Sequence, residues 1–240
     1  MGIDPVSLNT AGGLQTTLLR PVRWTGGDHV PVYRKHFGEP IPDVANIRNN
    51  PLMLDLFSRL GMLARLQSKL NTLSRKKGRI IPAKKTIACA LRACEETDNQ
   101  DIVFAGVEFL GHYHTEEETI AGVLAHEWGH LLSDWTEGLD PDRMSWEQIH
   151  ELRKEEEAAA DGFAGKMLYQ MGYSPDGMVK FLSKIQKKEC AKYHSTATRE
   201  AIIRTAFGKA KRIQHQAQAI SAAIRPVFSN PFTQKLIAVA

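Results

Sequence analysis

The segment AHEWGH, residues 125–130, places two histidines four residues apart inside an apolar stretch with helical spacing. Four residues of an α-helix advance about 400°, so His126 and His130 lie one turn apart on the same face. Both imidazoles can therefore reach one metal ion. Glu127 lies about 100° around the helix from His126, where its carboxylate can contact a water bound to that ion. The pattern fits either a zinc-binding catalytic helix or an amphipathic helix that carries two histidines by chance.

The histidine pair needs a third ligand. With 9 His and 27 Asp plus Glu among 240 residues, an HExxH pattern arises by chance in about 0.04 of such chains. Catalytic zinc takes three protein ligands and leaves the fourth position to water. The candidate is Glu157 in KEEEAAADGFAGKML, 27 residues after His130 (157 − 130 = 27).

Glu157 and Asp161 share one stripe of the next helical pattern with Ala164 and Leu168. Carboxylates on a buried face need partners. A metal ion satisfies Glu157, and the ring N–H of a ligand histidine satisfies Asp161, which then orients that ring. The alternative interpretation, a solvated acidic patch formed by residues 155–157, leaves Asp161 unexplained.

Taken together, these motifs resemble the gluzincin metallopeptidases, and the flanking residues look most like the M48 family. The similarity covers about residues 117–207 and follows the order of that family's elements. AGVLAHEWGHLL is similar to the active-site helix, EAAAD to the ExxAD element, MGYSPDGMVKFLSKI to the Gly-Tyr-x-Pro helix, and HSTATREAIIR to the late His and Arg element. The spacing from His130 to Glu157 is shorter than is usual in M48, and residues 1–85 show no such similarity.

The resemblance implies an α+β, zincin-like fold with a small mixed sheet and a mostly helical C-terminal half. It also implies one zinc ion per chain, held by His126, His130 and Glu157. The expected activity is hydrolysis of peptide bonds in a protein or peptide substrate, with Glu127 as the general base.

His194 and Arg199 map by the same resemblance onto the family's late His and Arg. His194 is then a catalytic residue that stabilises the developing oxyanion or covers the open metal position. Its alternative role is to cap the helix that begins near Arg199. Arg199 is expected to join Asp161 in supporting the metal ligands.

The remaining pattern predicts an irregular segment at residues 1–50 and a single zincin-like domain over residues 51–240. Whether residues 1–50 block the cleft stays open. We expect helices at Pro51–Ser74, Glu117–Trp135, Trp146–Met171, Asp176–Glu189 and Arg199–Ile224, and strands at Thr86–Leu91 and Ile102–Leu110. If Ile102–Leu110 is an edge strand, an extended substrate can pair with it.

Charge and composition argue against several classes of protein. The net charge of +4 is spread along the chain, with basic clusters only at residues 75–79 and 209–212, so we expect no nucleic acid partner. The three cysteines form no CxxC pair. No apolar run approaches the roughly 18 residues of a membrane span.

The N-terminal residues 1–5 lack the features of a signal peptide and resemble a cloning remnant. We therefore expect a soluble chain that is periplasmic or membrane-associated if a signal or anchor was trimmed, and otherwise cytoplasmic. The oligomeric state stays open.

A second function class is compatible with the sequence. The chain can be a zinc-dependent chaperone-like or regulatory binding protein whose gluzincin site is closed or latent. Its partner surface would then be the C-terminal helix at 199–224, whose apolar stripe and interspersed basic residues suit a partner or an acidic membrane surface. An intact Glu127 favours the enzyme, because metal storage does not need a base there.

Overall fold

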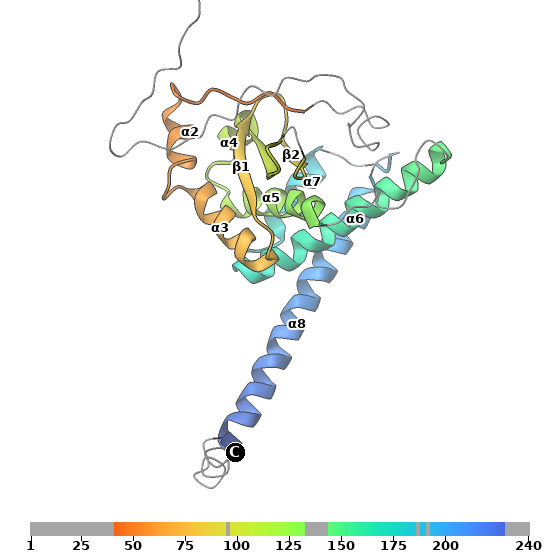
Figure 1. The fold of residues 1–240 in the computed structure, drawn as a ribbon. Helices are drawn as coiled ribbons and strands as arrows, with labels where there is room; N and C mark the ends of the chain where they lie inside the picture. The colour runs from red at the N-terminus through yellow and green to blue at the C-terminus, as the bar shows by residue number, and fades with distance from the viewer. Residues whose placement is uncertain (1–40, 95–96, 133–143, 186–187, 191–192, 229–240) are drawn as a thin grey trace, which may run out of the picture.

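The computed structural model describes residues 41–94, 97–132, 144–185, 188–190 and 193–228. Figure 1 shows a small sheet with helices beside and behind it, and one long helix that extends away from the rest of the structure. The elements are α2 (Pro51–Leu56), α3 (Met62–Ser74), β1 (Gly78–Ala83), β2 (Ala88–Leu91), β3 (Asp101–Gly106), α4 (Val107–Tyr113), α5 (Glu117–Leu132), α6 (Trp146–Met171), α7 (Asp176–Ile185) and α8 (Thr196–Phe228). The expected α+β class with a small mixed sheet is confirmed at this level.

The sheet has the strand order β1-β3-β2, with β1 parallel and β2 antiparallel to β3. The prediction of an edge strand at Ile102–Leu110 is wrong, because β3 is the central strand and all its residues are buried. That run also changes conformation at Gly106, after which α4 begins. The edge strands among the described residues are therefore β1 and β2.

The predicted helix at Pro51–Ser74 is two helices. α2 ends at Leu56, and the chain turns through a hydrogen bond from Gly61 N–H to the Ser58 carbonyl before α3 begins. A side chain on Gly61 would collide with the carbonyls of Asp55 and Leu56, so glycine permits this close turn. Leu63, Leu66 and Leu70 of α3 are buried, at the three- and four-residue spacing that places them on one helix face.

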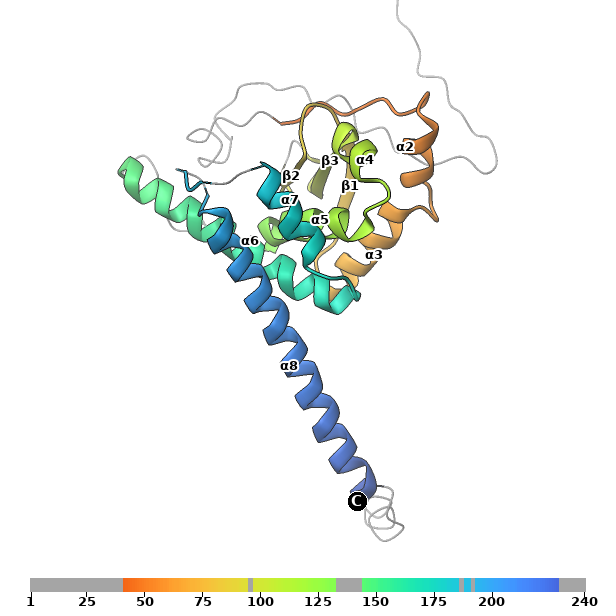
Figure 2. The ribbon, with the colours of Figure 1, turned by 180° about the vertical axis from the view of Figure 1, so that it is seen from behind.

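α5 lies against the sheet and is covered by α6 and α7, as the two opposite views show (Figure 2). Most of its residues are buried, including Ile120, Leu124 and Trp128. At Gly129 an added Cβ would lie 2.8 Å from the Ala160 Cα of α6, so the two helices cross in close contact. This crossing lies directly beside the histidines of α5 and the acidic residues of α6.

The helix ends explain which boundaries were predictable. α6 has the predicted bounds, because Ser145 and Gln148 form a capping box and Gly172 ends the helix with φ 84°. α7 ends at Ile185, short of the expected Glu189. Residues 133–135, at the end of the predicted active-site helix, and residues 1–40 of the N-terminal segment lie outside the described part of the chain.

α8 is longer than the predicted helix at Arg199–Ile224, since it covers Thr196–Phe228. Its first turns pack on α6, where Ile203 is fully buried. A side chain at Gly165 of α6 would collide with the Ile203 carbonyl, so glycine permits this close packing. Residues 211–222 are exposed, and this part of the helix extends away from the body (Figure 1). None of the helices in the described ranges is both long and apolar enough to cross a membrane.

Candidate metal centre

The crossing of α5 and α6 brings three predicted ligands together. His126 and His130 project from α5, with 3.2 Å between their Nε2 atoms. Glu157 projects from α6, and its Oε2 lies 3.1 Å from His126 Nε2, while its Oε1 lies 3.6 Å from His130 Nε2. His126 and Glu157 are buried, with 7% and 2% of their surface exposed. One donor atom from each of the three residues lies within 4.8 Å of the others, so the group can hold a metal ion.

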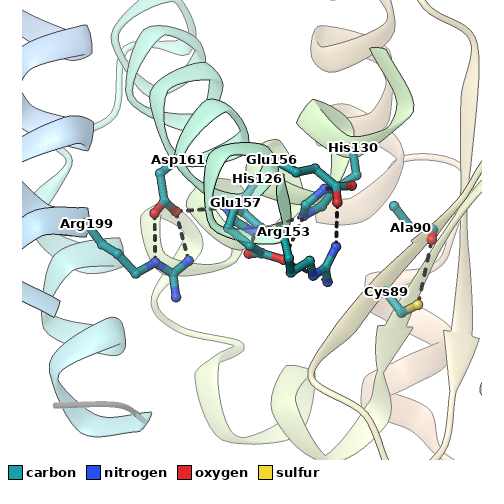
Figure 3. Close-up of polar contacts among 9 residues, drawn as sticks. All are labelled: Cys89, Ala90, His126, His130, Arg153, Glu156, Glu157, Asp161 and Arg199. Atoms are coloured by element: carbon teal, nitrogen blue, oxygen red, sulfur yellow. Dashed lines mark hydrogen bonds and ion pairs between the residues drawn. The ribbon is translucent and has the colours of Figure 1, made fainter. Parts of the chain in front are cut away.

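Behind His126 lies the pair formed by Asp161 and Arg199. His126 Nδ1 is 2.9 Å from Asp161 Oδ1, although the ring N–H is not well directed at this oxygen, so the contact is foremost an ion pair. Arg199 binds the same carboxylate with two hydrogen bonds, from Nε to Oδ2 at 2.7 Å and from Nη2 to Oδ1 at 2.9 Å (Figure 3). Asp161 has no exposed surface, so its charge depends on these two partners.

A matching arrangement lies behind His130. Glu156 Oε1 is 3.0 Å from His130 Nδ1, and Arg153 Nη1 donates to Glu156 Oε2 at 2.8 Å. Arg153 Nη2 also lies 2.8 Å from Glu157 Oε1. Glu156 and Arg153 were not among the site residues predicted from the sequence. Their spacing could have indicated them, because an arginine on a helix can pair with glutamates both three and four residues after it.

Glu127 lies on α5 beside the ligand group but contributes no ligand atom to it. Burial raises the pKa of its carboxyl above the ordinary value, while the nearby charges of His130 and His126 and a hydrogen bond from the backbone of Ala90 oppose this shift. Ala90 belongs to β2, so Glu127 lies between the ligand group and the edge of the sheet. A carboxyl with a raised pKa in this place is suited to accept and release a proton.

The charges of the centre are strongly coupled. Burial disfavours an imidazolium, but Asp161 and Glu157 outweigh this effect and raise the pKa of His126 to about 10. The pKa of His130 is also raised, because Glu157 and Glu156 outweigh burial. Burial favours the neutral form of Glu157, yet the charges of His130, His126 and Arg153 hold its pKa well below the usual range. A cation bound by this group therefore competes with protons on the histidines.

His194 does not belong to the group of converging ligand atoms among the described residues. It is half-buried and lies just before α8. Lys154 lowers the pKa of the Glu189 carboxyl, and His194 is near enough to add a smaller contribution. The alternative capping role belongs to its neighbour, since Ser195 Oγ accepts a hydrogen bond from the Thr198 N–H at 3.3 Å. A catalytic role for His194 stays a prediction.

The chain matched nothing in comparisons with models of known protein families, with curated proteins, and with solved structures.

Proposed function

We propose that the chain is a zinc-dependent endopeptidase of the gluzincin type, similar to the M48 family, with His126, His130 and Glu157 as zinc ligands. The observation that carries this proposal is the convergence of the three donor groups with Glu127 at their side. Two imidazoles and one carboxylate form a donor set that catalytic zinc accepts with one position left for water.

The spacing of the donor atoms supports zinc. Four ligands at about 2.0–2.1 Å in a tetrahedron lie about 3.3 Å from one another. The separations of 3.1 Å between His126 Nε2 and Glu157 Oε2 and of 3.2 Å between the two histidine Nε2 atoms are close to this value. These two pairs of ligand atoms therefore need only small movements to surround the ion.

In the proposed reaction, zinc when bound polarises the scissile carbonyl and lowers the pKa of water to about 7. Glu127 accepts a proton from the attacking water and delivers it to the leaving amine. Burial assists the first step, because it raises the pKa of the Glu127 carboxyl and so makes the carboxylate a better proton acceptor. Asp161 and Glu156 keep the two imidazoles oriented.

β2 is the proposed binding edge for an extended substrate segment, in place of the strand expected at Ile102–Leu110. The Ile87 carbonyl accepts a hydrogen bond from Gly106 N–H, and pairing alternates along an antiparallel ladder. The backbone polar groups of Ala88 and Ala90 therefore point away from β3. The hydrogen bond between Ala90 and Glu127 places this edge beside the proposed base. A substrate added as a strand would present its backbone to the centre with little demand on sequence.

One observation favours a second candidate, a zinc-dependent regulatory or chaperone-like binding protein. The part of α8 beyond the body exposes Ile213 and Ile220, with 56% and 60% of their surface accessible. Exposed apolar side chains on a projecting helix are suited to contact a partner. This candidate requires the metal centre but no turnover.

Hydrolysis of casein by the zinc-loaded chain tests the proposal and separates the two candidates. We expect the wild type to cleave casein, and Glu127→Gln to retain zinc but lose turnover, because the base is not a ligand. The control Glu108→Gln changes an exposed carboxyl on α4 and should leave both properties intact. Undiminished turnover in Glu127→Gln would contradict the assigned base. A zinc-loaded wild type without turnover would favour the binding protein.

A further inference from the structure

We infer that Glu156 and Arg153 are positioning residues of the metal centre: Glu156 orients His130, and Arg153 sets which oxygen of Glu157 faces the metal. This inference rests on the proposed use of His126, His130 and Glu157 as metal ligands. It assigns the centre a second support that is independent of Asp161.

The role of Glu156 follows from the two nitrogens of the His130 ring. Glu156 Oε1 lies 3.0 Å from His130 Nδ1, and a hydrogen bond to this oxygen favours the tautomer with the proton on Nδ1. The lone pair is then on Nε2, which is the atom 3.2 Å from His126 Nε2 and close to Glu157. A carboxylate in this place fixes both the tautomer and the direction of a ligand histidine.

The role of Arg153 follows from its two terminal nitrogens. Nη1 donates to Glu156 Oε2 and Nη2 lies against Glu157 Oε1, each at 2.8 Å (Figure 3). Because Oε1 of Glu157 is engaged by the guanidinium, Oε2 is the oxygen left for the metal, and it lies 3.1 Å from His126 Nε2. Arg153 thus favours coordination by one oxygen and preserves an open position for water.

Burial separates these contacts from an ordinary surface ion pair. Arg153 and Glu156 each expose 8% of their surface, and a buried carboxylate requires a compensating partner. The planar fork of arginine reaches two carboxylates at once, which an ammonium group cannot reproduce. Each ligand histidine therefore has its own supporting carboxylate, and each of these carboxylates pairs with an arginine. His130 is supported by Glu156 and Arg153, both from α6. His126 is supported by Asp161 from α6 and Arg199 from α8.

Zinc affinity of the full chain, measured by competition with a chelator, tests the role of Glu156. We expect Glu156→Gln to bind zinc about 10- to 100-fold more weakly than the wild type. The control is Glu151→Gln. Glu151 forms an ion pair with Lys154 on the same helix and at the same i,i+3 spacing, but its carboxylate is mostly exposed. That variant should bind zinc as the wild type does.

Arg153→Lys, loaded with cobalt in place of zinc, tests the second half of the inference. If the lysine releases Glu157 Oε1, the carboxylate can bind through both oxygens, and the visible absorption of cobalt should weaken as its coordination number rises. Glu151→Gln again serves as the control. This spectrum does not depend on turnover, and a merely structural ion pair would leave it unchanged.

Zinc affinities of Glu156→Gln within twofold of the wild type, or an unchanged cobalt spectrum in Arg153→Lys, would overturn the corresponding role. A wild type that binds no zinc would instead overturn the proposed centre itself, and the inference with it. If Glu156→Gln does not fold, Glu156→Asp replaces it in the same titration, because it keeps the carboxylate but draws it back from His130 Nδ1; zinc affinity within twofold of the wild type would again overturn the role of Glu156.

Discussion

Replacement of Gly129 by alanine probes the contact that sets the geometry of the centre. An added Cβ would lie 2.8 Å from the Ala160 Cα and 3.1 Å from its Cβ, whereas ordinary contacts begin at 3.4 Å. The shortfall at the Cα is about 0.6 Å (3.4 − 2.8). A backbone atom cannot rotate away, so α5 and α6 have to separate by about that amount.

The separation would disturb both stability and metal binding. Overpacking costs about 1–3 kcal/mol, and the better helix propensity of alanine returns up to about 1 kcal/mol. We expect a net loss of about 1–2 kcal/mol in the free energy of unfolding of the metal-free chain. Glu157 lies one turn before Ala160 and would move away from the histidines. Metal sites tolerate deviations of only about 0.2 Å in ligand distance, so zinc affinity should fall about tenfold or more.

Gly162→Ala is the matched control, because it makes the same change within α6. A Cβ there would meet only Ile202 Cγ2, at 3.8 Å, so this variant should be as stable as the wild type or up to about 1 kcal/mol more stable. Denaturant unfolding of the metal-free proteins and zinc titration against a chelator measure both effects. If Gly129→Ala unfolds and binds zinc like Gly162→Ala, the close contact between the helices does not set the ligand geometry.

Two further predictions concern His126 and its partner. Asp161→Asn keeps the shape of the side chain but removes its charge, so zinc affinity should fall about 10- to 100-fold by chelator competition; superimposable curves would remove Asp161 from the centre. The pKa of His126 is raised to about 10, so its protonated form stabilises the metal-free fold at low pH, and this contribution is lost as the pH rises towards that value. Zinc binding must displace this proton, and that displacement alone should raise the apparent affinity up to about tenfold per pH unit in the neutral range. A pH-independent affinity, after correction for the chelator, would contradict the raised pKa.

Local signals in the sequence predicted the elements that carry the centre. Ser145, Gln148 and Gly172 set the ends of α6 through short-range hydrogen bonds and a left-handed residue. The four-residue spacing of His126 and His130 placed both on one face, because α5 is a regular helix. The stripe that carries Glu157 and Asp161 likewise depends only on helical geometry.

Features that depend on long-range packing were not predictable. β3 is a continuous apolar run, and such a run has the same pattern at the centre of a sheet as at its edge, so the order β1-β3-β2 had no local signal. β1 was missed because Pro82 interrupts its pattern, which an edge strand tolerates. Glu156 was one of several consecutive glutamates, and only the packing of α6 on α5 places it against His130.

Zinc content after equilibrium dialysis, determined by elemental analysis, is the most direct test of a metal centre between α5 and α6. We predict about one zinc ion per chain for the wild type and little or none for His126→Ala and His130→Ala, because two remaining protein ligands rarely retain zinc. A wild-type chain without zinc, or full zinc content in both histidine variants, would contradict the assignment.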